Sequence, residues 1–253
     1  MSAAFGMQLK DWRGKRRFSQ LDLALTANVS ARHIAFLETG RSKPSREMIA
    51  QLAEALSIPR ADRNALLHAA GFAQTYKRRD LDDAELVHVR DAVTWTLQRH
   101  DPYPALAVDR HWCLVMANTA ATGLLSGIGM SIGDSMLDAA LNSDALRNSI
   151  VNWPDVAHHM IVRLRTESAY LGGDSILDAA ADQLAGDVKP NHETETLPAI
   201  VPTIYRAGDI QLSLFSTIAQ FGTAEDIALA DLKIELMFPA DDMTRNVFLA
   251  QAG

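Results

Sequence analysis

The segment from Ser30 to Arg41, SARHIAFLETGR, carries side chains that can read the edges of DNA bases. Its apolar residues recur at helical spacing over residues 31–39, which turns Ala31, Arg32 and Phe36 to the outward face of the helix. The guanidinium of Arg32 is a fork of donors that matches O6 and N7 of guanine, and apolar side chains can contact a thymine methyl group. The chemistry predicted for this segment is recognition of duplex DNA.

Two short helices are predicted to hold this face in place. Ser19 and Asp22 have the form of a capping box, so the first helix begins at Gln20 and ends near Ala27. Asn28 tolerates left-handed backbone angles, which favours a turn before the second helix. Small and apolar residues of the two helices are expected to pack together: Leu21, Ala24, Leu25, Val29, Ile34 and Leu37. This arrangement is a helix-turn-helix.

Three more helices are expected around this pair. The first ends near Arg17 and has an apolar face with Leu9 and Trp12 and a basic face with Lys10, Arg13 and Arg16. The other two are expected over residues 46–56 and 61–70, with a serine before the former and a glycine after the latter. An all-α, five-helix domain over residues 1–73 follows.

Charge is distributed unevenly along the chain. Residues 1–79 hold 14 Lys and Arg against 6 Asp and Glu, a net of +8, and the remaining residues carry a net of −15, which together give the net charge of −7. A basic N-terminal part attracts the phosphate backbone regardless of base sequence. Arg41 and Lys43, on the loop after the outward-facing helix, are expected to contact phosphates and so set its register on DNA.

Residues 5–73 resemble the DNA-binding domain of the Xre-type, phage-repressor-like transcription regulators. The resemblance rests on SQLDLA at the start of the first helix of the pair, the VS turn, and ETGRSKPS after the second helix. Asn28 departs from the pattern, in which glycine is commonest. The resemblance implies DNA contacts from Gln20, Ser30, Ala31, Arg32, His33 and Phe36.

The acidic remainder alternates between strand and helix patterns. A charged linker and a connecting helix are expected over residues 74–101, with a second domain over residues 102–253. Strands are expected at residues 105–108, 112–116, 200–205, 210–218 and 227–237. Helices are expected from Thr119 and at residues 135–141, 154–168, 175–184 and 241–249. An antiparallel sheet with helices inserted between its first two and last three strands is an α+β domain.

The stretches PALAVDRHWCLVMANTAA and NWPDVAHHMIVRLR resemble the MmyB-like ligand-binding domain, a PAS-like sheet that commonly follows an Xre-type N-terminal domain. The resemblance implies a sensor whose apolar pocket holds a lipid-like ligand such as a fatty acid. Arg163 is expected to meet a ligand carboxylate. The other expected pocket residues, each equally typical of an ordinary core, are Trp112, Met116, Trp153, Met160, Leu164, Phe215 and Met237.

A serine nucleophile is the strongest rival chemistry. Ser135 lies in GDSM, the stretch that holds the nucleophile of self-cleaving repressors, where a buried lysine must accept the serine proton. Residues 165–180, where that family carries the lysine, contain none, and the only lysines after Ser135 are Lys189 and Lys233. With Asp138 three residues on, Ser135 is equally an ordinary helix N-cap.

Metal and redox chemistry have weaker signals. His158 and His159 are adjacent, so they lie on different faces of a helix and do not chelate one ion. The sequence KPNHETET at residues 189–196 places a histidine beside two glutamates, which leaves a metal site open there. The single cysteine, Cys113, is expected to be a small buried residue. We predict no metal and no cofactor other than a bound apolar ligand.

These observations predict a cytosolic, sequence-specific transcription regulator rather than an enzyme. Neither a signal peptide nor a membrane-spanning segment is expected from the apolar pattern of the sequence. The expected partners are a double-stranded DNA operator, a small apolar ligand and a second copy of the chain in a homodimer. The alternatives are a DNA-bound protein whose acidic domain docks a protein partner and, third, a self-cleaving serine peptidase.

Overall fold

The computed structural model describes residues 2–187, 200–222 and 224–251, and they divide into two compact units. The first unit comprises residues 1–78 with the segments 169–174 and 223–230, and the second comprises the rest of the chain. In the described residues, no helix has the length and apolarity needed to cross a membrane.

Five helices lie within residues 2–78 of the first unit. They are α1 (Ser2–Lys15), α2 (Gln20–Thr26), α3 (Ala31–Glu38), α4 (Arg46–Ala55) and α5 (Arg60–Ala69). All five contribute to one apolar core, whose members include Phe5, Leu9, Leu23, Ile34, Leu37, Ile49, Leu52 and Leu66. The expected five-helix N-terminal domain is confirmed.

The ends of α2 and α3 are set by the predicted residues. The Ser19 hydroxyl accepts a hydrogen bond from the backbone of Asp22, whose carboxylate accepts one from the backbone of Ser19. This capping box holds the pKa of Asp22 below its usual value. The Ser30 hydroxyl caps α3 by accepting from the backbone N–H of His33, at 3.1 Å. Asn28 has a φ of 49°, so the turn between the helices is left-handed as expected.

The expected packing of α2 is wrong at two positions. Leu21 and Leu25 are 58% and 72% exposed, whereas Leu23 and Ala24 are buried. At 3.6 residues per turn, Leu21 and Leu25 lie roughly a third of a turn or more away from the direction in which Leu23 and Ala24 face the core. Ala24 therefore makes the expected core contact, whereas Leu23 takes the place of Leu21 and Leu25.

The second unit contains an antiparallel five-stranded sheet among its described residues. Its strands are β1 (Ala105–Val108), β2 (Leu114–Ala117), β3 (Thr203–Ala207), β4 (Ile210–Gln220) and β5 (Lys233–Pro239), in the order β2-β1-β5-β4-β3. A 3-10 turn at Ala84–Leu86 leads into α6 (Val87–Arg99), and the helices that follow are α7 (Thr119–Ser126), α8 (Met136–Asn142), α9 (Asp144–Ser149), α10 (Trp153–Tyr170), α11 (Ser175–Asp187) and α13 (Asp242–Gln251). Helix α12 (Ile227–Asp231) lies mostly in the first unit. The expected α+β fold is confirmed.

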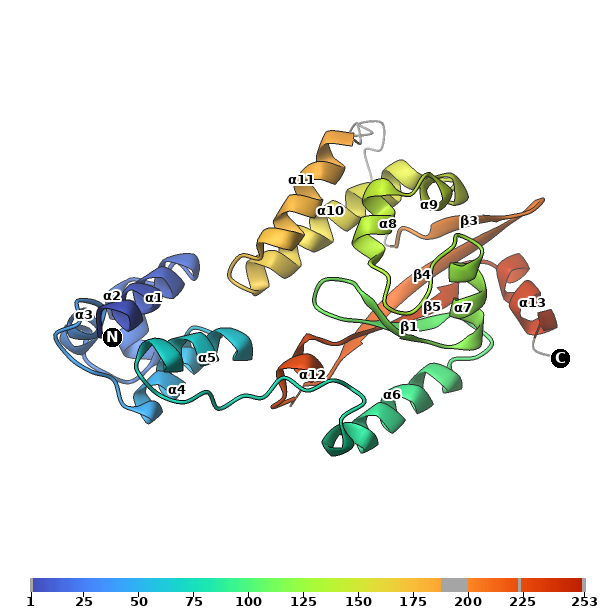
Figure 1. Cartoon of the computed structure of the whole chain (residues 1–253). Helices are drawn as coiled ribbons and strands as arrows, with labels where there is room; N and C mark the ends of the chain where they lie inside the picture. Colours follow the sequence, from blue (N-terminus) through green and yellow to red (C-terminus); the bar gives the residue numbers. More distant parts are fainter. Residues whose placement is uncertain (1, 188–199, 223, 252–253) are drawn as a thin grey trace. The chain divides into compact units, whose positions relative to one another are not determined.

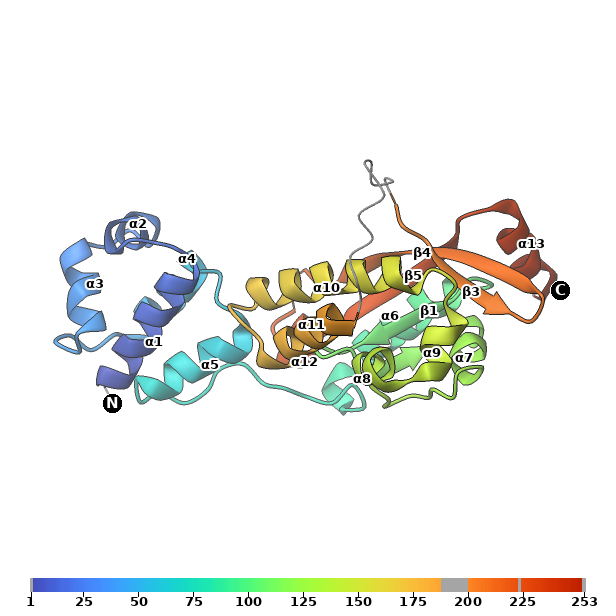
Figure 2. The same cartoon turned by 90° about the horizontal axis from the view of Figure 1, so that it is seen from above.

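Helices cover both faces of this sheet. In Figure 1, α6 lies on one side of the strands, and α8 to α11 lie on the other. Helix α6 buries Val93 and Leu97 against Ala105, Ala107 and other small or apolar residues of the sheet. On the opposite side, α10 and α11 run next to one another, as both Figure 1 and Figure 2 show.

Two elements of the second half differ from expectation. Residues 227–231 form α12 rather than the start of a strand, and β5 begins only at Lys233. The Asp226 carboxylate accepts a hydrogen bond from the backbone of Ala228 at 2.8 Å, which starts a helical turn where the apolar run alone reads as strand. The short helix α9 was also not expected; its N-cap is Ser143, whose hydroxyl accepts from the backbone of Leu146.

Gly6 lets α1 approach the end of α3. A Cβ at this position would lie 2.4 Å from the carbonyl oxygen of Glu38 and 2.6 Å from that of Leu37. Gly14, in the same helix, has no such neighbour within 4 Å.

We predict that Gly6→Ala lowers the free energy of unfolding by about 1–3 kcal/mol, because the added methyl group forces the two backbones apart. The matched control, Gly14→Ala, should leave stability unchanged or raise it by up to about 1 kcal/mol, because alanine favours helix. Urea unfolding followed by circular dichroism measures both. Equal stability of the two variants would contradict the close approach of α1 to α3.

Candidate DNA-binding surface and ligand cavity

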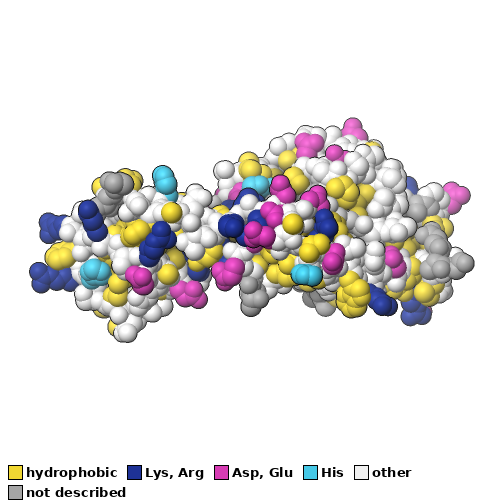
Figure 3. All heavy atoms as spheres, turned by 60° about the horizontal axis from the view of Figure 1, so that its bottom comes forward, with side chains coloured by type: hydrophobic (Ala, Val, Ile, Leu, Met, Phe, Trp, Pro, Cys, Tyr) yellow, Lys and Arg dark blue, Asp and Glu magenta, His cyan; other side chains and the backbone are white. Residues whose placement is uncertain are grey.

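The outward face of α3 presents cations held against an aromatic ring. Arg32 is exposed, and its guanidinium lies 5.2 Å from the centre of the Phe36 ring. The guanidinium of Arg41, from the following loop, lies 5.9 Å from the same ring. Phe36 therefore gathers two positive charges on one side of the helix-turn-helix. Figure 3 shows lysine and arginine side chains gathered over the first unit.

The remaining predicted DNA contacts lie around this face. Ser30 is exposed, His33 and Ala31 are half-buried at the first turn of α3, and Lys43 is exposed on the loop. The loop is fixed at its start, because the backbone N–H of Ser42 donates to the carbonyl of Phe36 at 3.1 Å.

Gln20 is held by a buried ion pair that sequence reasoning missed. Its side-chain amide donates to Glu38 Oε2 at 2.7 Å. Arg13 donates to the same carboxylate, through Nε to Oε1 at 2.6 Å and through Nη2 to Oε2 at 3.1 Å. The side chain of Glu38 is only 4% exposed. One carboxylate thus connects α1, α2 and α3, and it fixes the amide of Gln20 beside the reading helix.

This contact was not predictable from local sequence patterns. Arg13 was expected on the basic outer face of the first helix, but its side chain is only 15% exposed. Arg13 and Glu38 are 25 residues apart, so no local spacing rule joins them. Only the position of Glu38 at the end of a helix with an apolar inner face hinted at an inward carboxylate.

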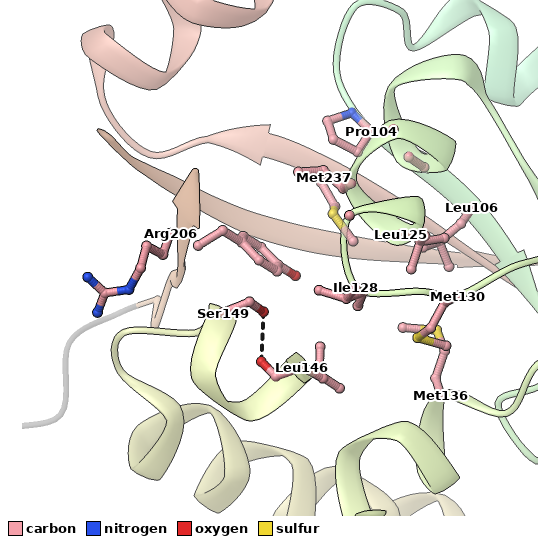
Figure 4. Close-up of a pocket in the computed structure, with 15 residues that line it drawn as sticks. Pro104, Leu106, Leu125, Ile128, Met130, Met136, Leu146, Ser149, Arg206 and Met237 are labelled. Carbon is pink, nitrogen blue, oxygen red and sulfur yellow. Dashed lines mark hydrogen bonds between the residues drawn. The ribbon is translucent and has the colours of Figure 1, made fainter. Parts of the chain in front are cut away.

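An apolar cavity of about 260 Å³ lies in the second unit, between the sheet and helices α7 to α9. Its wall comes from both layers, and it consists of Pro104, Leu106, Ala121, Gly123, Leu124, Leu125, Gly127, Ile128, Met130, Met136, Leu146, Ser149, Tyr205, Arg206 and Met237. Figure 4 shows the apolar side chains of Ile128, Met130 and Leu125 around this space.

Few polar groups border the cavity. The Ser149 hydroxyl donates to the carbonyl of Leu146 at 2.7 Å, so its proton is already used (Figure 4). Burial, reinforced by the charge of Glu235, raises the pKa of Tyr205, which keeps its phenol neutral. Arg206 is exposed, and its guanidinium points away from the apolar side chains of the cavity (Figure 4). The cavity therefore offers an apolar interior with a neutral phenol.

Met237 is the member of the predicted ligand-binding set that lines this cavity. Leu164 is fully buried in α10, where Met160 and Trp153 are half-buried. Met116 packs in the core beneath α6. Phe215 stacks on Phe238, with the ring centres 5.6 Å apart, beside a separate open groove near α13. These residues, with Trp112 and Arg163, lie outside the wall of the cavity.

Trp112 and Arg163 belong to a charged cluster centred on Glu167. Glu167 accepts from Trp112 Nε1 at 3.0 Å, from Lys233 at 2.9 Å and from Arg163 at 3.1 Å. Both cations lie 4.1 Å from the centre of the Trp112 ring. Burial lowers the pKa of Lys233, and the carboxylate of Glu167 opposes that shift. Arg163, which also lies 3.9 Å from Glu235, is thus paired within the protein.

The serine, cysteine and histidine residues considered for catalysis or metal binding do not form such sites among the described residues. The Ser135 hydroxyl accepts from the backbone N–H of Asp138 at 3.1 Å and caps α8, as expected. Cys113 is half-buried rather than buried, and burial raises the pKa of its thiol. His158 and His159 are both exposed. No group of three metal-binding side chains occurs in the described part of the chain, and the predicted histidine and glutamates at residues 189–196 lie outside it.

Family comparisons find a matching domain in each part of the chain. A helix-turn-helix domain matches residues 4–66, and the MmyB-like transcription regulator ligand binding domain matches residues 89–250. Together they define a ligand-responsive, DNA-binding transcription regulator. Because the second match covers more than half of the chain, the chain belongs to the MmyB-like transcription regulators. The resemblance seen in the sequence is confirmed. No curated protein matches the chain.

We predict that Glu38→Gln lowers the free energy of unfolding by about 3 kcal/mol, because it leaves the guanidinium of Arg13 largely buried without its counter-charge. The control is Glu54→Gln, because Glu54 is 81% exposed and pairs with Arg63 across 3.5 Å, which makes it a weak surface ion pair. This change should lower the free energy of unfolding by less than about 1 kcal/mol. Chemical denaturation of both variants provides the comparison. A small loss for Glu38→Gln would show that its ion pair does not hold the three helices together.

Proposed function

We propose that this chain binds a specific DNA operator as a homodimer and that a fatty-acid-like ligand controls the binding. Residues 1–73 form the DNA-binding domain, residues 74–101 the linker with its connecting helix, and residues 102–253 the ligand-binding domain. The observation that carries the proposal is the outward face of α3, where Arg32 and Arg41 stand against Phe36.

The face of α3 fits the major groove in both size and chemistry. An eight-residue helix with an exposed arginine reaches only a few base pairs, and the cations of Arg41 and Lys43 neutralise phosphates beside them. Gln20 and Ser30 lie at the N-terminal ends of their helices, where DNA contacts in helix-turn-helix proteins occur. Two copies on half-sites one helical turn apart supply the specificity that one reading helix lacks.

The cavity favours a short or medium acyl chain. Its volume of about 260 Å³ lies just below the range of about 300–1,000 Å³ that small-molecule sites occupy, and its wall is mainly Leu, Ile and Met. A neutral Tyr205 can donate a hydrogen bond to a carboxylate. An empty space of this kind supports a small ligand over the alternative of a protein partner docked on a fully packed domain.

Ligand control follows from differential affinity. A ligand that fills the cavity shifts operator affinity only by the ratio of its affinities for the two states of the regulator. The apolar wall makes the free energy of binding depend on the methylene groups buried there.

Changes in the reading helix and in the loop should have different effects on DNA binding. Arg32→Ala should relax base preference at one operator position by about 1–3 kcal/mol, because a bidentate contact to a base edge is lost. Lys43→Ala should weaken binding to all sequences, because it removes a phosphate contact. It should also reduce the slope of log affinity against log salt concentration by about one. Fluorescence anisotropy on operator and single-base variants separates them. Equal losses on every sequence from both changes would contradict the assignment of Arg32.

A series of straight-chain acids should reveal the extent of the cavity. Each added methylene should tighten binding about fourfold, from about 0.8 kcal/mol per buried methylene, until the space is full. Tyr205→Phe should weaken binding of the acids, because it removes the phenol donor, and Leu125→Trp should fill the cavity and abolish binding. Calorimetry on delipidated protein measures these affinities, and native mass spectrometry identifies what the purified protein carries. Binding that is independent of chain length would contradict an apolar cavity site.

A further inference from the structure

Helix α6 has an outer face with a tryptophan at its centre. Val93 and Leu97 are buried beneath the helix, whereas Trp95, on the opposite side, is 60% exposed. Tryptophan is the residue type most enriched among those that dominate binding energy at protein interfaces. The guanidinium of Arg99 lies 5.5 Å from the centre of the Trp95 ring.

Charges are placed symmetrically about this tryptophan. Asp91 lies four residues before Trp95, and Arg99 lies four residues after it, so all three lie on one ridge of the helix. All three are exposed, and Asp91 forms no ion pair with a described residue. From Asp91 to Arg99, the ridge therefore carries an acid, an aromatic ring and a base, in that order.

Such a ridge complements a second copy of itself when the two run antiparallel. Asp91 of each copy then faces Arg99 of the other, with the two Trp95 side chains at the centre. A parallel pairing would instead place like charges together. The neighbouring row contains Ala92, which is exposed and small and so leaves a groove for the opposing ridge. Figure 3 brings the side of the second unit that carries α6 forward, where charged and hydrophobic side chains are mixed.

We propose that α6 is the self-association surface of this regulator and that two copies pack there antiparallel about Trp95. This inference rests on the proposed homodimer and names the surface that forms it. The partner is a second copy because the charge pattern is complementary to itself.

The size of the surface sets the strength of the contact. Helix α6 has 13 residues and is about 20 Å long, so one helix pair buries less than the roughly 1,000 Å² of a stable interface. A reversible dimer with a dissociation constant on the order of micromolar is expected in the absence of DNA. Adjacent half-sites then strengthen the pairing by bringing two copies together.

Sedimentation of the full chain over a concentration series tests the surface without DNA or ligand. Trp95→Ala should raise the dimer dissociation constant about tenfold or more. The matched control is Val162→Ala, since Val162 is an exposed aliphatic residue on α10, and it should leave the constant unchanged. Because these side chains face solvent, circular dichroism should show unaltered folding in both variants.

Charge exchange tests the antiparallel arrangement directly. Asp91→Arg alone and Arg99→Asp alone should each weaken dimerisation, because each places like charges opposite one another. The double variant D91R/R99D should restore it, and an equimolar mixture of the two single variants should form a heterodimer.

The outcomes separate this inference from the proposed function. If Trp95→Ala and both single charge variants dimerise as strongly as the wild type, α6 is not the self-association surface, and the proposed homodimer still stands. A monomer at every concentration, with one copy bound per operator, would overturn both. Binding to a single half-site, measured in parallel, reports on the reading helix alone.

Discussion

The carboxylate of Glu38 is the contact on which the DNA-reading surface depends. It accepts hydrogen bonds from Arg13 and Gln20, so one largely buried anion fixes the relative positions of α1, α2 and α3. A buried charge is costly unless its hydrogen bonds are satisfied, and here the fork of Arg13 and the amide of Gln20 satisfy both oxygens. Ile34 and Leu37 add the apolar anchor on the inner side of α3. The outer side of α3 is therefore held rigidly, as base recognition requires.

One strand of the second unit, β5, contributes both to a charged cluster and to the wall of the apolar cavity. Lys233, Glu235 and Met237 occupy every second position of β5, so their side chains lie on one face of the sheet. Lys233 and Glu235 belong to the charged cluster centred on Glu167, and Met237 lines the cavity. The charged cluster pairs its members internally, and it leaves the cavity wall almost free of polar groups. Glu235 also reaches electrostatically to Tyr205, where it opposes ionisation of the phenol. An acidic domain can thus contain a site for an apolar ligand.

Local sequence signals predicted the first unit well. Helix caps act through neighbouring backbone groups, so Ser19, Asp22 and Ser30 could be assigned from spacing alone. In α2 the burial of Ala24 was predicted, but Leu21 and Leu25 were expected in the core in place of Leu23, because all three leucines match an apolar pattern. The Arg13 and Glu38 pair lay beyond any local rule. The outward direction of Arg32 and Phe36 followed from the helical period and holds in the structure.

The second unit was predictable as a class and less so in detail. Apolar alternation revealed most of the strands, but a side-chain cap at Asp226 turned residues 227–231 into helix. Cavity residues cannot be told from core residues by type, because both are apolar and buried. Met237 lines the cavity, whereas Arg163 pairs with Glu167 four residues along the same helix, a partner that the (i, i+4) spacing alone could have indicated.

The central claim is that the outer side of α3 reads base sequence in the major groove. Selection of bound duplexes from a random library by the full chain, followed by sequencing, measures this most directly. The account predicts a preferred word repeated in inverted orientation, with its halves one helical turn apart. Recovery of no preferred word would contradict it.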